Sequence, residues 1–255
     1  MIDNIREICN VAWGDIRFMK HTAVNVLIMS MMSPLLYLLA FGYGLGRVQD
    51  IDVGGVSYIA FIIPGIVALT ALSASFSSVS TRMNVQRLYY RNFDEMMLCP
   101  LRFSSIAIGK AMLGIIRGLL SCSIVFVLGY ALTYNTEYPL VFSIEFVITL
   151  FVSCFAFSML GEAAAFLAKS HQSMSTFSTL IILPMTFLCG TFFSVSSMPE
   201  WFQGILYMMP LTYSSTLMRE SMLGSDFSWP FLLILAAFGI ALMLLNIYLM
   251  RSRRI

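Results

Sequence analysis

The sequence predicts an all-α integral membrane protein. Of its 255 residues, 59% are hydrophobic and 11% are charged, whereas a typical soluble domain carries about 25% charged residues. The apolar residues gather in runs longer than the roughly 18 residues that indicate a membrane-spanning helix. These runs lack the alternation of apolar and polar residues found in barrel strands, so helices are the structure that satisfies their backbone groups within a bilayer.

Six apolar runs of spanning length follow one another along the chain. They cover residues 22–46, 57–80, 106–133, 141–168, 174–194 and 229–250. Little remains for a separate soluble domain, so residues 1–255 are expected to form a single transmembrane domain. The N-terminal stretch is too charged, and the first run too long, for a cleaved signal peptide, so the first span is expected to be retained.

Six spans place both termini on one side of the membrane, and the basic residues indicate which side. Outside the spans, Arg47 and Arg219 are the only arginines or lysines expected on the side opposite the termini. Loops that remain in the cytoplasm are enriched in lysine and arginine. Both termini are therefore expected in the cytoplasm, and the chain is expected in the inner or plasma membrane of a prokaryote.

Residues 3–20 are predicted to form an amphipathic helix before the first span. Its apolar positions recur at steps of three and four, namely Ile5, Ile8, Ala12, Ile16 and Met19. Polar residues occupy the opposite face, so the helix is expected to lie on the inner surface of the membrane. An ordinary juxtamembrane helix without a binding partner is the alternative.

The cytoplasmic loop after the second predicted span is long and mixes basic with aromatic residues. The loop contains Arg82, Arg87 and Arg91 together with Tyr89, Tyr90 and Phe93. A loop that only reversed the chain would be shorter and more polar. Arginine beside aromatic and methionine side chains is typical of a protein-binding surface. The alternative is an interfacial helix whose arginines contact anionic lipid head groups.

A third segment, residues 199–222, connects the last two spans on the outer side. Pro199 suits the start of a helix, Trp201 and Phe202 begin an apolar stripe, and Pro210 ends it. A second short helix is expected at about 212–222. Two helices too short to span the membrane predict a hairpin that dips into the outer leaflet. A surface lid without a role in transport is the alternative.

Arg117 and Glu162 are ionisable residues that lie deep inside the predicted spans. Arg117 lies seven residues after Lys110, and Glu162 lies seven residues before Lys169, which places both about 10 Å from the cytoplasmic flank. A matched pair offsets the cost of burying each charge, so a salt bridge is predicted. Changing either residue to glutamine is expected to reduce the yield of folded protein.

The sequence contains no motif of a membrane enzyme. It lacks H-E-x-x-H, G-x-S-x-G and the glycine-rich phosphate loop G-x-x-x-x-G-K-[ST]. Its five scattered cysteines argue against disulfides and metal sites, and the charge distribution gives no footprint for nucleic acid. Any ATP is therefore expected to be handled by another chain.

Two stretches resemble the type-2 ABC transporter permease family. The first is Asp94-Glu95-Met96-Met97-Leu98-Cys99-Pro100-Leu101 followed by Gly109-Lys110. The second runs from Leu183-Pro184 through Gly190-Thr191-Phe192-Phe193, continues as Met198-Pro199-Glu200-Trp201-Phe202 and ends at Pro210-Leu211-Thr212-Tyr213. The length and predicted topology of the whole chain also fit. Within the family, the pattern is most similar to branches that export drug-like molecules or lipid-linked oligosaccharides.

The resemblance implies the permease subunit of an ATP-driven exporter. The amphipathic helix 3–20 and a coupling helix at 82–97 would bear on a separate ABC ATPase subunit, and a second copy of the permease would complete the path. The coupling residues would be Arg82, Arg87, Arg91, Asp94, Glu95 and Met96. Pro199, Trp201 and Phe202 would form an outer gate. ATP and Mg would be bound by the partner, and no cofactor by this chain.

Two other classes of protein remain open at this stage. An ion-coupled secondary transporter should carry ionisable residues at mid-membrane and broken helices in symmetry-related positions. Arg117, Glu162 and Glu145 are the candidates available for such a role. A non-catalytic membrane scaffold is the third possibility. Co-purification of an ATPase distinguishes the exporter from both.

Overall fold

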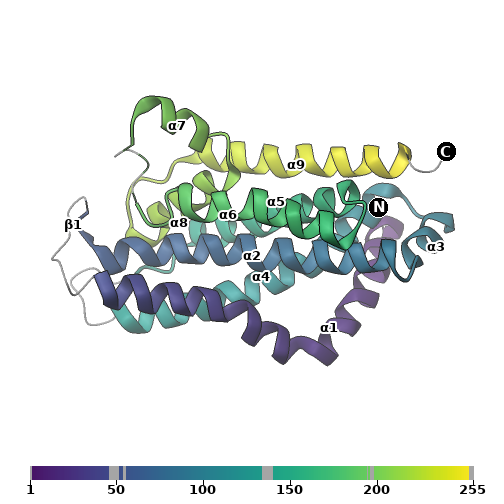
Figure 1. The fold of residues 1–255 in the computed structure, drawn as a ribbon, viewed down its shortest axis with the longest axis horizontal. Coiled ribbons are helices and arrows are strands. Elements are labelled where there is room, and N and C mark those ends of the chain that lie inside the picture. The colour runs from purple at the N-terminus through teal and green to yellow at the C-terminus, as the bar shows by residue number, and fades with distance from the viewer. Residues whose placement is uncertain are drawn as a thin grey trace.

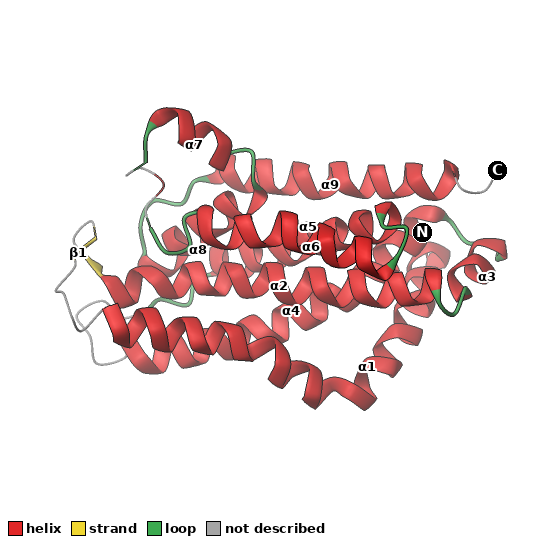
Figure 2. Cartoon of the chain, in the orientation of Figure 1, coloured by secondary structure: helices red, strands yellow, loops and turns green. Residues whose placement is uncertain are grey.

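The computed structural model describes residues 2–45, 52–53, 56–133, 140–193, 195 and 198–252. These residues are almost entirely helical (Figure 2). The elements are α1 (Ile2–Tyr37), the π-helix η1 (Leu38–Leu45), β1 (Asp52–Val53), β2 (Val56–Ser57), α2 (Tyr58–Leu88), α3 (Asn92–Leu98), α4 (Phe103–Thr133), α5 (Ile144–Leu167), α6 (His171–Leu188), α7 (Glu200–Leu206), α8 (Pro210–Leu223) and α9 (Trp229–Ser252). The two short strands pair in antiparallel fashion.

Four helices form an elongated bundle. α2, α4, α5 and α9 run side by side along the long axis, with α3 and the end of α9 at one end and β1 and α7 at the other (Figure 1). We call these the α3 end and the α7 end. Each of the four helices is long and apolar enough to cross a membrane. The sequence prediction of a helical membrane protein is confirmed to this extent, and the count of six spans stays a prediction.

Helix α2 lies at the centre of the bundle. In its most apolar window 89% of the residues are buried, against 22% for α9. α2 contacts α1, α4, α5 and α8. Helix α5 approaches α2 closely because a glycine of α5 lies at the contact. A Cβ at Gly161 would lie 2.7 Å from the carbonyl oxygen of Phe76 on α2. Small residues at such crossings are what allows membrane helices to pack without a hydrophobic driving force between them.

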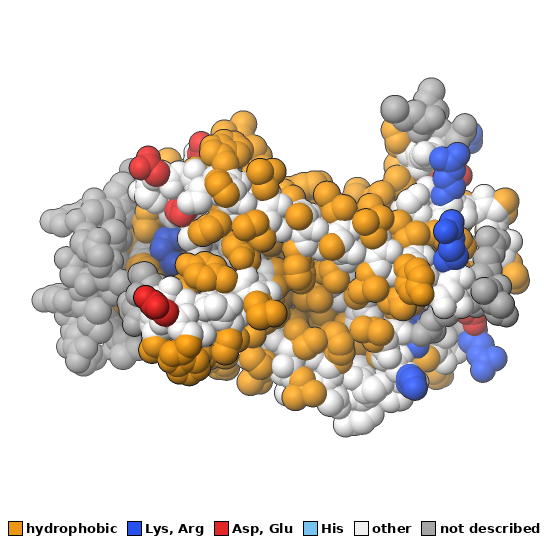
Figure 3. Space-filling view, turned by 90° about the horizontal axis from the view of Figure 1, so that it is seen from above, with side chains coloured by type: hydrophobic (Ala, Val, Ile, Leu, Met, Phe, Trp, Pro, Cys, Tyr) orange, Lys and Arg blue, Asp and Glu red, His pale blue; other side chains and the backbone are white. Residues whose placement is uncertain are grey.

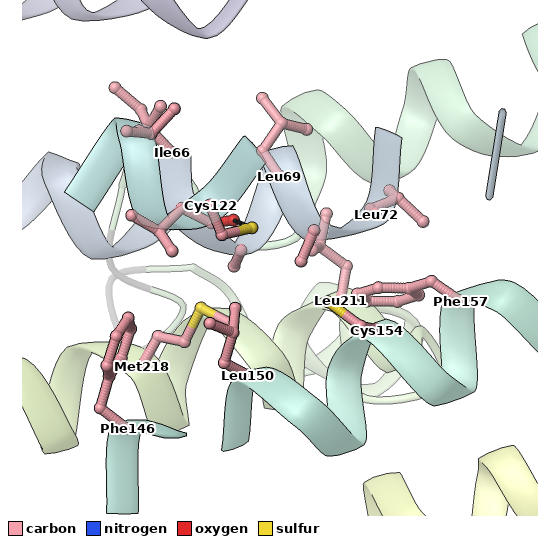
Figure 4. Packing of buried hydrophobic residues seen from close by; sticks show 14 of the residues in the cluster. Ile66, Leu69, Leu72, Cys122, Phe146, Leu150, Cys154, Phe157, Leu211 and Met218 are labelled. Carbon is pink, nitrogen blue, oxygen red and sulfur yellow. Dashed lines mark hydrogen bonds between the residues drawn. The ribbon is translucent and has the colours of Figure 1, made fainter. Parts of the chain in front are cut away.

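The apolar core extends from α2 to three neighbours. Figure 4 shows part of this cluster, in which Ile66, Leu69 and Leu72 of α2 lie together with residues of α4, α5 and α8. On α5 the inward positions recur every three or four residues, at Phe146, Leu150, Cys154 and Phe157. This spacing puts them on one face of the helix, because successive turns bring such positions into register.

Two segments differ from their predicted boundaries at the α3 end. The amphipathic helix 3–20 and the start of the first predicted span form one continuous helix, α1, which bends partway along (Figure 1). The predicted coupling helix 82–97 is wrong as a single element. α2 continues to Leu88 because Met83, Gln86 and Arg87 still pack inward, and α3 follows after a turn in which Arg91 has φ 56°.

Two short helices stand at the α7 end, within the segment predicted to form the hairpin. α7 ends at Leu206, Pro210 begins α8, and Gly224 ends α8 with φ 71°, a left-handed conformation that glycine adopts without strain. α8 packs deeply into the bundle. Arg219 donates from Nε to the Phe61 carbonyl (3.3 Å) and from Nη2 to the Gly190 carbonyl (2.9 Å), and its guanidinium lies 3.9 Å from the centre of the Phe61 ring.

Candidate functional site

A buried carboxylate joins three helices at the α3 end. Asp15 of α1, with only 2% of its side chain exposed, accepts from Arg82 Nε (3.1 Å) and Gln86 Nε2 (2.8 Å) at Oδ1 and from Lys110 Nζ (2.7 Å) at Oδ2. Lys110 also donates to Gln86 Oε1 (2.8 Å). We call Asp15, Arg82, Gln86 and Lys110 the Asp15 network. It closes a ring of hydrogen bonds among α1, α2 and α4.

The helices position these side chains through their periodicity and one close contact. Arg82 and Gln86 lie four residues apart and therefore on one face of α2. On α4, Lys110 follows Gly109, where an added Cβ would lie 2.8 Å from Val11 Cβ and 3.1 Å from the Ile8 carbonyl oxygen. The absence of a side chain at Gly109 lets α1 pack directly on α4. Gly109-Lys110 thus supplies both the contact and the charge.

Helix α3 is held against the same end of the bundle by an apolar cluster. Phe93, which is 2% exposed, packs with Met83, Ile106, Phe166 and Met250, and its ring centre lies 5.5 Å from that of Phe166. These partners come from α2, α4, α5 and α9. The cluster therefore attaches α3 to four helices at once.

The structure divides the six predicted coupling residues into two groups. Arg91, Asp94 and Glu95 are exposed around α3, and Met96 is half-buried. Arg82 belongs to the Asp15 network. The role of the six residues in contacting an ATPase stays a prediction. The exposed residues Arg91, Asp94 and Glu95 are the ones that a partner could reach directly.

Arg87 has a structural position that its place in the sequence did not indicate. It is buried, and it donates to the carbonyl oxygens of Ala165 and Ala168 at the end of α5. The last carbonyls of a helix lack partners within the helix, and a cation there also complements the helix dipole. Arg87 therefore caps α5 instead of facing outward.

Arg117 and Glu162 do not come together as the predicted pair. The ion pairs formed among the described residues both involve Asp15. α4 begins at Phe103, so Arg117 lies about four turns into that helix, whereas Glu162 is little more than one turn from the end of α5. The sequence prediction took Lys110 as the flank of the span, but Lys110 already lies about two turns inside α4.

Glu162 has a different partner, on α9. The fully buried Glu162 accepts at Oε2 from Asn246 Nδ2 (3.2 Å), and the same Nδ2 donates to the Met159 carbonyl (3.0 Å). These two bonds fix the orientation of the amide. Asn246 thus joins Glu162 and the backbone of α5 to α9.

The predicted outer-gate residues lie at the start of α7. Trp201 is 72% exposed, Pro199 is exposed, and Phe202 is half-buried. The ring centres of Trp201 and Phe202 are 5.4 Å apart. The structure places these residues next to one another on the surface of the α7 end, and their action as a gate stays a prediction.

Sequence reasoning missed Asp15 although a signal for it existed. Asp15 lies on the same face of the predicted amphipathic helix as the apolar residues Ala12, Ile16 and Met19. A carboxylate on such a face is costly unless a cation meets it. That cost predicts a buried partner, but periodicity alone does not indicate which lysine or arginine supplies it.

No group of three or more His, Cys, Asp or Glu side chains gathers as metal ligands would within the ranges that the structure describes. The five cysteines, Cys9, Cys99, Cys122, Cys154 and Cys189, are all free thiols.

Four helices that are long and apolar enough to cross a bilayer indicate a membrane protein. The chain belongs to the ABC-2 type transporter family, whose sequence model matches residues 6–223. It is 32% identical to Nodulation protein J of Rhizobium leguminosarum bv. trifolii over 218 residues, which cover 84% of this chain and 78% of that protein. It is 27% identical to the inner membrane transport permease YadH of Escherichia coli K12 over 213 residues, covering 82% of this chain and 79% of YadH.

Proposed function

We propose that the chain is the permease subunit of an ATP-driven exporter that moves a hydrophobic, drug-like or lipid-linked substrate out of the cytoplasm. Family membership supports the class of protein. The observation that carries the mechanism is the Asp15 network, because it ties the N-terminal helix to the two central helices α2 and α4. ATP and Mg would be bound by a separate ABC ATPase subunit.

In this proposal the α3 end receives the ATPase. Residues of α1, α2, α3 and α4, among them Asn10, Gly14, Asn92 and Met96, surround a cavity of about 400 Å³ there, together with Leu101 between α3 and α4. Exposed Arg91, Asp94 and Glu95 lie around α3 close to it. A partner that contacts α3 and the start of α1 would act on elements already joined to the bundle by Phe93 and Asp15. Movement of the ATPase would then be transmitted to α2 and α4.

The distribution of charge supports the α3 end as the cytoplasmic end. Figure 3 shows a broad apolar zone between an end rich in lysine and arginine, which is the α3 end, and an end where acidic side chains gather. Basic residues mark the cytoplasmic side of membrane proteins. We place both termini in the cytoplasm of a prokaryote, α7 and α8 on the outer side, and the chain in the inner membrane.

Two further helices would complete six spans. The second half of α1 with η1 continues along the bundle (Figure 1), and α6 contributes 18 residues. Exposed Leu180, Leu183 and Phe187 on α6 offer an apolar surface for lipid or for a second copy of the permease. We infer a homodimer, in which two copies enclose the path.

Co-purification tests the partner. Affinity-tagged chain, extracted from native membranes in mild detergent, is expected to recover an ATPase of the ABC class. Changing Arg91, Asp94 and Glu95 together to alanine should reduce that recovery severalfold. The matched control is Glu200→Ala, an exposed acidic residue of α7 at the opposite end. Recovery that is equal for the triple variant and the control contradicts docking at α3, and the absence of any ATPase contradicts the exporter.

A further inference from the structure

One face of α2 carries exposed polar side chains although most of the helix is buried. Between Tyr58 and Leu88 the two exposed side chains are Ser77 and Thr81. Both carry a hydroxyl, and they lie four residues apart, so they share a face. With the neighbouring Ser78 and Arg82 they line a cavity of about 400 Å³. The hydroxyls of Ser77 and Thr81 thus line open space beside α2.

The opposite walls of the cavity add a second arginine. α4 contributes Leu113 and Arg117, and α1 contributes Asp15 and Met19. The charged side chains of the lining are thus Arg82, Arg117 and Asp15, and Asp15 already accepts hydrogen bonds from Arg82, Gln86 and Lys110. Two arginines and one aspartate give the lining a net positive charge.

The cavity also extends from a polar into an apolar region. Arg82 lies near the end of α2, while Arg117 lies about four turns into the apolar helix α4. An arginine at such depth is costly unless it meets a polar group or water. Met19, Val85 and Leu113 supply apolar walls between the charged groups. A ligand matching this lining has an anionic head and an apolar body.

We propose that this cavity binds the phosphate-bearing head group of an anionic membrane phospholipid. Guanidinium groups match the oxygens of a phosphate with paired, charge-assisted hydrogen bonds. Ser77 and Thr81 add hydroxyl donors. Basic pockets between membrane helices on the cytoplasmic side are sites where anionic head groups bind. The bound lipid would lie beside the Asp15 network and contact the same three helices.

Lipid binding by the chain alone tests the proposal without the ATPase, so its failure is distinct from a failure of the exporter proposal. The purified full-length chain in neutral detergent is titrated with dioleoyl phosphatidylglycerol or dioleoyl phosphatidylcholine, and bound lipid is counted by native mass spectrometry. Phosphatidylglycerol is expected to bind more tightly. Arg117→Gln should weaken its binding about tenfold, the loss expected for a charge-assisted hydrogen bond.

Two further variants separate binding from folding. Arg102→Gln removes an exposed arginine at the same end but outside the cavity, and it should bind phosphatidylglycerol as the unchanged protein does. Changing Ser77 and Thr81 together to valine keeps every charge and the Asp15 network, yet should also weaken binding. If the Arg117→Gln variant does not fold, the variant with valine at Ser77 and Thr81, called the hydroxyl variant, still tests the proposal.

Three results would overturn the proposal. They are equal affinity for the two lipids, unchanged binding of phosphatidylglycerol by the hydroxyl variant, and displacement of phosphatidylglycerol by inorganic phosphate at millimolar concentration. The last result would assign the site to free phosphate. Retention of phosphatidylglycerol in the presence of phosphate supports a lipid as the ligand, because the apolar walls then contribute to binding.

Discussion

Among single residues, Asp15 has the largest number of charged partners in the part of the chain that the structure describes. Its carboxylate is buried and accepts from Arg82, Gln86 and Lys110. A carboxylate removed from water is costly, and ion pairs with added hydrogen bonds offset that cost. Such a site specifies how α1 sits on α2 and α4, because another arrangement would leave charges unpaired.

Asp15→Asn is predicted to destabilise the protein. Lys110, with 5% of its side chain exposed, would lose its carboxylate partner, and breaking a buried pair costs about 3–5 kcal/mol. The measurement is the free energy of unfolding by denaturant in detergent. Asp94→Asn on exposed α3 is the control and should change it by less than about 0.5 kcal/mol. Equal stability of the two variants would show that the network does not support the fold.

Glu162 leads to a prediction opposite to the one made from sequence. Its partner is the amide of Asn246, so Glu162→Gln keeps an oxygen that can accept from Asn246 Nδ2. We expect Glu162→Gln to retain most of the folded yield. Asn246→Leu leaves the buried Glu162 without this donor and should cost about 1–3 kcal/mol. Size-exclusion profiles and thermal unfolding of the two variants are compared. A greater loss of folded protein for Glu162→Gln than for Asn246→Leu would support an ion pair of Glu162 instead.

At the scale of helices, the contact between α1 and α4 depends on one missing side chain. A Cβ at Gly109 would lie 2.8 Å from Val11 Cβ, whereas Gly14 on α1 has no atom within 4 Å of that position. Gly109→Ala is expected to lower stability by about 1–3 kcal/mol through overpacking. Gly14→Ala is the matched control, and it should be neutral or slightly stabilising because alanine favours helix. Equal effects in thermal unfolding would contradict direct packing of α1 on α4.

The length of the apolar runs predicted which segments form helices more reliably than it predicted where those helices end. The runs at 57–80 and 229–250 correspond to α2 and α9, since a span must match the thickness of the bilayer. The end of α2 could not be predicted from the length of the apolar run. Its last turns carry polar residues such as Gln86 and Arg87, which look like a loop in sequence. They are helical because Lys110 and the end of α5 satisfy them, and such long-range partners leave no local pattern.

The candidate site shows the same division between local and long-range information. Exposure of Arg91, Asp94, Glu95 and Trp201 accords with their polar or interfacial surroundings in the sequence. The capping of α5 by Arg87 and the bond between Glu162 and Asn246 join residues more than seventy positions apart. Neither spacing nor composition contains these pairings, so the predicted partner of Glu162 was wrong while its burial was anticipated.

In the whole molecule, the α3 end and the central helices are expected to move together. Phe93 attaches α3 to the ends of four helices, and the Asp15 network attaches α1 to α2 and α4. A force applied at this end by an ATPase would therefore reach the centre of the bundle. In the proposed exporter, the helices joined in this way would form the two-state element that the nucleotide states of the partner bias.

The rate of ATP hydrolysis by the purified complex in lipid nanodiscs tests this claim most directly. The complex containing Asp15→Asn should hydrolyse ATP severalfold more slowly than the unchanged complex, at the same ratio of ATPase to permease. Asp94→Asn serves as the control for charge at the same end. An unchanged rate in an intact complex with Asp15→Asn would contradict coupling through the Asp15 network.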